Sequence, residues 1–170
     1  MDVIDRSGGG SGSRQKLMVD PQTNCDARVI GRSGGRIRVL LADDHEIVRQ
    51  GLTNLLGFEP DLEVVGEAGN GRQAVDLVRQ LKPAVVLMDV TMPEMNGIEA
   101  THLLLSEMPE VRVIGLSMHT HEEMAALMRA AGAVRYLAKG GQIEDLIKAI
   151  REVCPRQDND LPGGRNASGR

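Results

Sequence analysis

Short apolar runs and longer amphipathic segments alternate along most of this chain. The runs are rich in Val, Ile and Leu, and most lack a polar face, as buried strands of a parallel sheet do. In the segments between them, apolar residues recur at the spacing of one helix face. The pattern predicts strands over residues 37–42, 62–68, 84–90, 111–116 and 134–138, with helices over residues 45–57, 74–81, 98–108, 124–131 and 143–153. Strict alternation predicts an α/β fold, in which a doubly wound parallel sheet has helices on both faces.

The alternation begins near Arg36 and ends at Val153. Before it, Gly8–Ser13 and Ser33–Gly35 lie in a stretch without a sustained period, which is typical of a flexible linker. After it, the chain is polar and rich in Gly and Pro. The sequence therefore predicts a flexible leader or linker over residues 1–35, one domain over residues 36–153 and a disordered tail over residues 154–170.

Composition and charge narrow the class of protein. The 170 residues are 41% apolar with one Phe, one Tyr and no Trp, which predicts an aliphatic core with Met as filler. Between residues 36 and 153, 18 Asp and Glu outnumber 12 Lys and Arg, which argues against a nucleic-acid-binding face. Cys25 and Cys154 fall in the predicted leader and tail without metal-ligand spacing, as expected of thiols in a reducing compartment. The absence of a membrane-spanning run or signal peptide predicts a cytoplasmic protein without membrane attachment.

Polar side chains follow four of the five predicted strands. Asp43 and Asp44 follow the first strand, and Asp89 ends the third. Ser117 and Lys139 follow the fourth and fifth. Because ligands of such sheets bind at the carboxyl ends of the strands, we expect these five side chains to form one site.

The chemistry of this group suits a divalent cation and a phosphoryl group. Three nearby carboxylates repel one another unless a cation lies among them, and Mg²⁺ prefers such oxygen ligands while leaving room for a phosphate oxygen. The Asp89 carboxylate is central in the group and could attack a phosphoryl group to form an aspartyl-phosphate. Lys139 would then neutralise phosphoryl oxygens, and the Ser117 hydroxyl would donate a hydrogen bond.

Each of these residues also has an ordinary structural explanation. Asp89 could start a turn, and Asp43-Asp44 could cap the helix that follows. Ser117 could be a turn residue, and Lys139 could be a surface charge beside a helix. It is the convergence of all five at one edge of the sheet that favours a functional site.

The histidines are expected to be incidental. His119 and His121 are two residues apart with no third ligand nearby, so the sequence does not predict a metal site there. His45 is interpreted as a solvated residue at the start of a helix, and His102 as an ordinary helix residue.

The motifs resemble those of the receiver domains of bacterial two-component response regulators, which have a CheY-like fold. The resemblance covers residues 36–153. The matching segments, in the order and approximate spacing of the family, are Asp43-Asp44-His45, Met88–Gly97, Leu116-Ser117 and Tyr136–Lys139. The resemblance implies a flavodoxin-like sheet of five parallel strands in the order 2-1-3-4-5.

The resemblance implies a role for each residue of the site, and Asp89 would be the phosphoacceptor. It implies that Asp44 and Asp89 bind Mg²⁺ together with the backbone carbonyl of Thr91. Asp43 would act through a water molecule. The phosphoryl group would come from the phosphohistidine of a histidine kinase or a histidine phosphotransfer protein.

The resemblance also implies how the signal leaves the site. Ser117 and Lys139 would contact the phosphoryl group, and Tyr136 would change rotamer with the switch. Core packing is an alternative role for Tyr136 that its sequence context leaves open. Homodimerisation on phosphorylation, through the first and last helices or the face around Tyr136, is a further expectation by analogy.

Within the family, the chain is most similar to the NarL/FixJ branch. The similarity lies in Asp43-Asp44-His45, in Arg49–Leu52, and in Lys139-Gly140, where other branches have Lys-Pro. Two positions depart from the branch: Ala84 stands where Asp is common, and Arg135 where Gly is common. These departures put local turn geometry and surface contacts in doubt more than phosphorylation.

The branch usually carries a DNA-binding helix-turn-helix after the receiver, and the 17 residues after Val153 are too few for one. We therefore expect a stand-alone receiver, a receiver piece of a hybrid kinase, or a regulator cut off before its output domain. The Gly/Ser-rich leader favours the second, because such a linker joins a receiver to an upstream module.

Two other functions compete with the phosphoacceptor. A phosphatase of the haloacid dehalogenase type also uses an Asp nucleophile, a Ser or Thr, a Lys and Mg²⁺. In that family the nucleophile comes first as Asp-x-Asp, whereas here the acidic pair comes first and Thr91 occupies the place of the second Asp. The other alternative is a degenerate receiver that serves only as a docking module.

Overall fold

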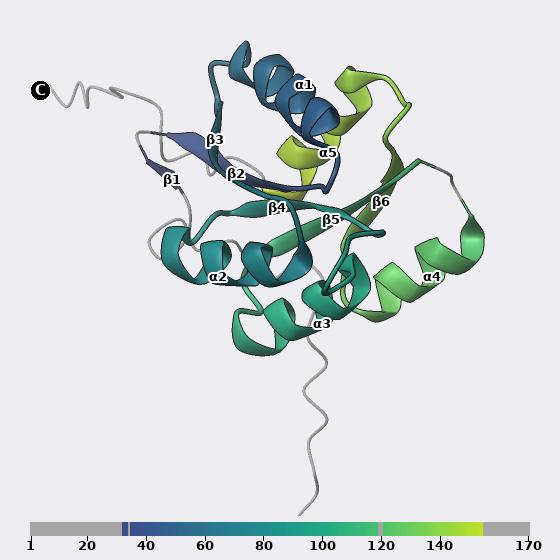
Figure 1. Ribbon diagram of the computed structural model, residues 1–170. Coiled ribbons are helices and arrows are strands. Elements are labelled where there is room, and N and C mark those ends of the chain that lie inside the picture. Colours follow the sequence, from purple (N-terminus) through teal and green to yellow (C-terminus); the bar gives the residue numbers. More distant parts are fainter. Residues whose placement is uncertain (1–31, 34, 119–120, 155–170) are drawn as a thin grey trace, which may run out of the picture.

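The computed structural model describes residues 32–33, 35–118 and 121–154, which form one sheet with helices on both sides (Figure 1). The strands are β1 (Arg32–Ser33), β2 (Arg36–Ala42), β3 (Leu62–Ala68), β4 (Val85–Asp89), β5 (Arg112–Ser117) and β6 (Arg135–Ala138). The helices are α1 (Glu46–Gly57), α2 (Gly71–Leu81), α3 (Gly97–Glu107), α4 (Glu122–Ala130) and α5 (Ile143–Val153). Every predicted strand and helix is present, with ends shifted by a few residues.

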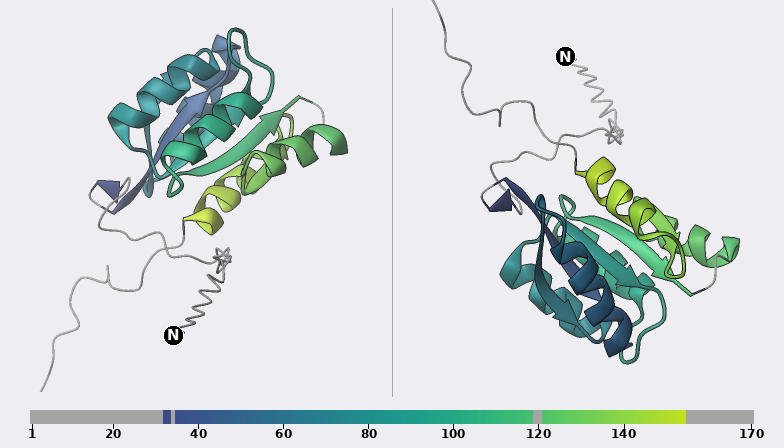
Figure 2. Two further views of the ribbon diagram at one scale, coloured as in Figure 1. Left: turned by 90° about the horizontal axis from the view of Figure 1, so that it is seen from below. Right: turned by 90° about the horizontal axis from the view of Figure 1, so that it is seen from above.

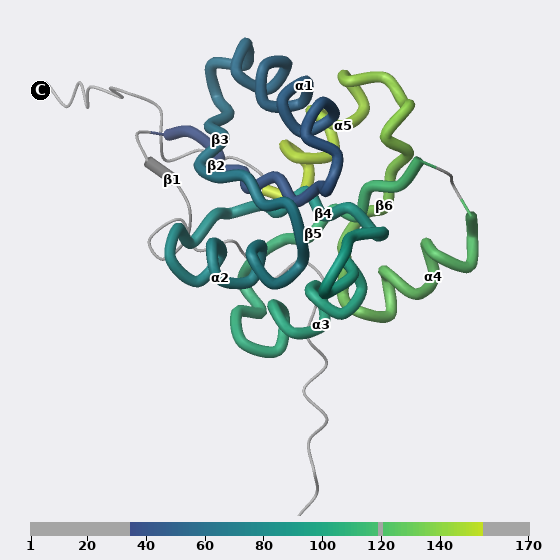
Figure 3. Tube along the Cα trace, in the orientation of Figure 1, coloured from purple at the N-terminus to yellow at the C-terminus, as the bar shows by residue number. Residues whose placement is uncertain are grey.

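The parallel strands lie in the order β3-β2-β4-β5-β6, and the path of the chain through them can be followed in Figure 3. Counted without β1, this is the order 2-1-3-4-5, so the predicted topology is confirmed. The strand order reverses beside β2, because β2 pairs with both β3 and β4. The carboxyl ends of β2 and β4 flank this switch point, where a doubly wound sheet binds its ligands.

The two ends of the domain differ from the prediction. β1 pairs antiparallel with the start of β2 through Gly35, whose φ of +83° is a turn conformation that glycine adopts readily. The sequence places Ser33 and Gly35 in the predicted linker, because glycine is common both in linkers and in hairpin turns. Cys154, placed by the sequence in the tail, is 3% exposed and belongs to the core. Other residues of the predicted leader and tail, Cys25 among them, lie outside the described residues, as does His119.

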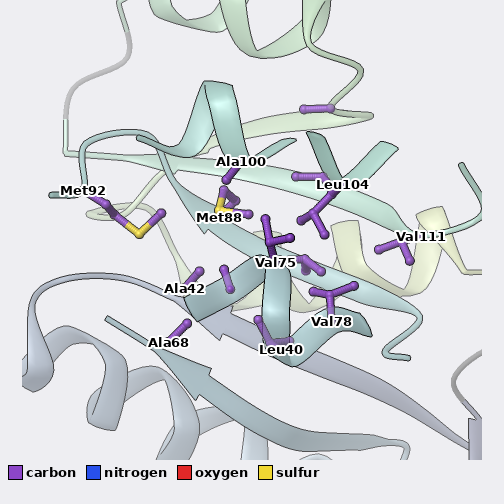
Figure 4. Close-up of a cluster of buried hydrophobic side chains, with 14 of the residues drawn as sticks. Leu40, Ala42, Ala68, Val75, Val78, Met88, Met92, Ala100, Leu104 and Val111 are labelled. Carbon is purple, nitrogen blue, oxygen red and sulfur yellow. The ribbon is translucent and has the colours of Figure 1, made fainter. Parts of the chain in front are cut away.

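Alternate residues of the central strands point to opposite faces of the sheet. In β2 and β4, Leu40 and Met88 contribute to the core beneath α2, α3 and α4, whereas Leu41 and Leu87 contribute to the core beneath α1 and α5. Figure 1 shows these two helix layers on opposite sides of the sheet, Figure 2 views the molecule from below and from above, and Figure 4 shows the first core. Both cores are aliphatic with Met, as the composition predicted.

One helix is less buried than its sequence pattern suggested. Leu56 is the buried residue of α1. The sequence predicts that the apolar residues of this helix share one face, namely Ile47, Val48, Leu52, Leu55 and Leu56. In the structure, Ile47 is 86% exposed and Leu55 is 45% exposed. The predicted face includes residues that are adjacent in the sequence. Successive helical residues are about 100° apart around the helix axis, so only some of them can face the sheet.

In the part of the chain described here, no helix has the length and apolar content needed to cross a lipid bilayer.

Candidate functional site

The register of the sheet brings the predicted residues to one edge. Ala42 pairs with Met88, so the residues that follow them, Asp43 and Asp89, leave the sheet side by side. On the other side of β4, Asp89 pairs with Leu116, one residue before Ser117.

Lys139 lies between the two buried carboxylates. Its Nζ is 2.7 Å from Asp89 Oδ2 and 2.8 Å from Asp43 Oδ2. The three side chains are only 3–4% exposed. Two buried carboxylates therefore share one buried ammonium, which compensates one of their two negative charges and leaves the other at the edge of the sheet.

The pKa of Asp89 is shifted by burial and by its neighbours. Burial raises the pKa of Asp89 above its ordinary value, and the Asp43 carboxylate adds to the effect. Lys139 and the Thr91 amide, which donates to Asp89 Oδ1 at 3.2 Å, both oppose the rise in pKa. The net shift is upward, so the folded protein holds the charged form of Asp89 at a cost.

Asp44 and His45 extend the acidic group toward solvent. The His45 Nδ1 lies 2.9 Å from Asp44 Oδ1 and 3.3 Å from Asp43 Oδ1. One ligand atom from each of Asp43, Asp44, His45 and Asp89 lies within 4.8 Å of the others. Sequence reasoning interpreted His45 as a solvated residue at the start of a helix. Its ring is indeed exposed, but it also contacts both acids, and its place directly after two Asp residues was the available signal.

These residues fit a hard divalent cation. Three carboxylates converge there, two of them buried with a single shared ammonium. Carboxylate oxygens are the ligands that Mg²⁺ prefers. An added positive charge would oppose the rise in the pKa of Asp89 that burial causes and to which Asp43 adds.

The remaining predicted residues lie close by in the sheet. The Ser117 carbonyl accepts a hydrogen bond from the Lys139 amide at 2.8 Å, which ties the ends of β5 and β6 together. Tyr136 pairs with Gly115 in the sheet, and its half-buried ring packs against the core under α2, α3 and α4. Lys139 contacts the carboxylates of Asp43 and Asp89. Its predicted contact with a phosphoryl group, and the predicted roles of Ser117 and Tyr136, stay predictions.

The loop from β4 to α3, which includes Thr91, is held against α2. The Gly71 amide donates to the Met95 carbonyl at 3.1 Å, and Asn70 Nδ2 donates to Glu94 Oε1 at 3.2 Å. Glu94 has a φ of +65°, a left-handed conformation that few side chains adopt without support. The loop is therefore held in place by contacts from Asn70 and Gly71, which do not belong to the group of Asp43, Asp44, His45 and Asp89.

We expect Gly71→Ala to destabilise the protein by about 1–3 kcal/mol, because a Cβ at this position would lie 2.3 Å from the Met95 carbonyl oxygen. Urea unfolding measures the change. Gly51→Ala is the matched control, since its Cβ would meet open space on α1 and should stabilise the helix by about 0.4–1 kcal/mol. Equal stability of the two variants would contradict close packing of the loop on α2.

Comparison with known proteins places this site in a family. A model of the response regulator receiver domain matches residues 39–151, most of the described chain. This chain belongs to the response regulator receiver domain family. Receiver domains of response regulators are signalling modules of two-component systems.

Relatives of this receiver domain include full response regulators. It is 42% identical to the response regulator GacA of Pseudomonas aeruginosa over 121 residues, which cover 71% of this chain and 56% of the relative. It is 39% identical to the transcriptional regulatory protein DegU of Brevibacillus brevis over 70% of this chain and 50% of the relative. It is 40% identical to the nitrate/nitrite response regulator protein NarL of Escherichia coli over 68% and 54%. The chain spans about half the length of these relatives, and their type confirms the predicted branch.

Solved structures agree with the fold. A two-component response regulator of the LuxR family from Aurantimonas sp. SI85-9A1 superposes with a TM-score of 0.67 at 35% identity, over 69% of this chain and 84% of that one. The response regulator domain of Thermotoga maritima CheB gives a TM-score of 0.66 at 35% identity, over 69% and 96%. The receiver domain is therefore a CheY-like fold, as predicted.

Proposed function

We propose that this receiver domain accepts a phosphoryl group on Asp89 in the presence of Mg²⁺ and thereby switches its partner-binding surface. The observation that carries the proposal is the Lys139 ammonium shared by Asp89 and Asp43 at the buried edge of the sheet. It leaves one carboxylate without a counter-charge beside the nucleophile. A divalent cation would supply that counter-charge and would also offset the negative charge of an incoming phosphoryl group.

The proposed step is a displacement at phosphorus. An Asp89 oxygen attacks the phosphorus of a phosphohistidine, and an oxygen–phosphorus bond forms as the nitrogen–phosphorus bond breaks. The electron pair of the broken bond returns to the imidazole nitrogen of the donor. The products are an aspartyl-phosphate on this chain and an unmodified histidine on the donor.

The site residues divide the work. Asp44, Asp89 and the Thr91 carbonyl would hold Mg²⁺ directly, and Asp43 would hold it through water. When bound, Mg²⁺ neutralises charge on the transferred oxygens. Lys139 moves from its pairing with Asp89 to the phosphoryl group, and Ser117 donates a hydrogen bond to it.

Release of the signal follows from the change at Ser117 and Lys139. Tyr136 lies on β6, three residues before Lys139, and pairs with Gly115 of β5. Its half-buried ring would change rotamer and alter the surface around β6. The donor is a histidine kinase or a histidine phosphotransfer protein, and the modified domain is proposed to dimerise. We place this function in the cytoplasm, with no direct DNA contact by the described domain and no catalytic turnover beyond self-phosphorylation from small donors and autodephosphorylation.

The test is incubation of the full chain with acetyl phosphate and Mg²⁺, followed by intact mass measurement. We expect one added phosphoryl group, located by fragmentation to the peptide containing Asp89, and no adduct when a chelator replaces Mg²⁺. Failure to form the adduct in the unmutated protein would overturn the proposal.

The same samples separate the alternatives. Sustained release of phosphate from a phosphomonoester would indicate a phosphatase of the haloacid dehalogenase type instead. A protein with neither adduct nor thermal shift on addition of Mg²⁺ would be a docking module.

A further inference from the structure

An ion-pair network outside the acidic group reaches its backbone. Arg49 on α1 is 17% exposed, and its Nε donates to Glu67 Oε2 on β3 at 3.0 Å. Its Nη1 donates to the backbone carbonyl of Asp43 at 2.6 Å. Thr53, one turn further along α1, donates from Oγ1 to the other Glu67 oxygen at 2.8 Å. Both oxygens of Glu67 are thus engaged, so Arg49 is held in place before it reaches Asp43.

The Asp43 carbonyl is one of three anchored groups in that residue. The Asp43 amide donates to the Ala68 carbonyl at 3.0 Å, and Asp43 Oδ1 accepts from the His45 amide at 2.8 Å. Contacts from α1, from β3 and from the turn itself therefore fix the chain where it leaves β2. Arg49 supplies the contact to the carbonyl.

That carbonyl determines the direction of the next residue. The peptide unit between Asp43 and Asp44 is planar, so fixing the carbonyl oxygen of Asp43 also fixes the amide nitrogen and Cα of Asp44. The Asp44 carboxylate is 31% exposed, and its described contact is with the exposed ring of His45. Its direction consequently depends on its backbone more than on a packed environment.

We propose that Arg49 is a positioning residue for metal binding, which sets the orientation of Asp44 through the Asp43 carbonyl. The inference rests on the proposed function, because it concerns the Mg²⁺ site described there. Residues that orient ligands without touching the metal commonly change metal affinity by about 10–100-fold when replaced.

The geometry requires arginine at this position. A guanidinium donates along several fixed directions, which lets Nε bind Glu67 while Nη1 binds Asp43. A lysine ammonium is a single point on a flexible stem, and it cannot hold both groups in this arrangement. Arg49→Lys thus keeps the positive charge and loses the simultaneous hydrogen bonds to Glu67 and to the Asp43 carbonyl.

The test compares Mg²⁺ binding to the full chain and to variants by isothermal titration calorimetry. Arg49→Lys should weaken Mg²⁺ binding by about 10-fold or more. The matched control is Arg79→Lys, because Arg79 also binds a carboxylate through two nitrogens, to Glu107 at 2.8 and 2.7 Å, but on the exposed surface between α2 and α3. Mg²⁺ binding by Arg79→Lys should be unchanged.

Milder variants keep the inference testable if Arg49→Lys folds poorly. Thr53→Val removes the hydroxyl that steadies Glu67, and it should weaken Mg²⁺ binding in the same direction by a smaller factor. The double variant Glu67→Gln, Arg49→Lys should weaken Mg²⁺ binding by less than the product of the two single fold-changes, because both residues act through one network. Unfolding of each variant without Mg²⁺ shows whether weaker Mg²⁺ binding comes from a misplaced Asp44 or from a general loss of stability.

The outcomes distinguish this inference from the proposed function. Loss of stability in Arg49→Lys with an unchanged Mg²⁺ dissociation constant would overturn the positioning role and leave the proposed function standing. No Mg²⁺ binding by the unmutated protein would overturn both.

Discussion

Asp89→Asn is expected to abolish the phosphoryl adduct and, at neutral pH without Mg²⁺, to make the protein more stable. The adduct is lost because the amide has no nucleophilic carboxylate oxygen. Stability rises because burial, with the help of Asp43, raises the pKa of Asp89, so its charged form is held at a cost that a neutral side chain avoids. We expect a gain of about 0.5–2 kcal/mol, the size typical of a single stabilising substitution.

The dependence on pH gives this prediction its sign. A carboxyl whose pKa is raised on folding stabilises the fold at low pH, and that contribution is lost as pH rises from its ordinary pKa through the raised one. The unmutated protein should therefore lose stability across that interval, and Asp89→Asn should lack this loss. The two proteins should converge below the ordinary carboxyl pKa and differ most above the raised pKa.

Urea unfolding at a series of pH values measures the effect, and mass measurement after treatment with acetyl phosphate and Mg²⁺ measures the adduct. Asp76→Asn is the control, because Asp76 is an exposed acid on α2 paired with Arg79, and its replacement should give no gain. A less stable Asp89→Asn would show that the pair with Lys139 contributes more than burial costs.

The sequence was sufficient to predict the layered fold and the convergence of Asp43, Asp89 and Lys139 at one edge of the sheet. Strand residues with no polar face predicted burial on both sides, and Leu40 and Leu41 do lie in opposite cores. Parallel strands align their carboxyl ends, so residues far apart in the chain, such as Asp43 and Lys139, could be placed together without coordinates. Strand order, in contrast, came from resemblance, because periodicity does not encode which strands are neighbours.

What the sequence could not predict depends on contacts made in three dimensions. Arg49 was visible only as part of a branch motif, since its partners Glu67 and the Asp43 carbonyl are brought to it by the pairing of β3 with β2. The contact of His45 with both acids needs the geometry of the turn. Exposed apolar residues such as Ile47 look like core residues until the helix is packed.

Lys139→Met is expected to destabilise the protein without Mg²⁺ by about 3–5 kcal/mol at neutral pH. The change removes the ammonium that lies within 2.8 Å of both Asp43 and Asp89, and it leaves two buried carboxylates facing each other. The pKa of Asp89 should rise further, because Lys139 is the main group that opposes the effect of burial. The same variant should form the adduct about 100-fold more slowly, since a charge that stabilises the phosphoryl oxygens is lost.

Two conditions should restore the stability of Lys139→Met, and both follow from its charge. Lowering the pH protonates Asp89 and removes the repulsion, and adding Mg²⁺ supplies a replacement cation, so thermal unfolding should recover with either. Lys148→Met, which removes an exposed ammonium on α5 at the limit of contact with Glu152, should change neither stability nor the rate of adduct formation. If Lys139→Met is as stable as the unmutated protein from neutral pH down to the pH at which Asp89 is protonated, the Lys139 ammonium does not offset the charges of Asp43 and Asp89. The same result would leave the site without its reason to attract a cation, because relief of that imbalance is what Mg²⁺ would provide.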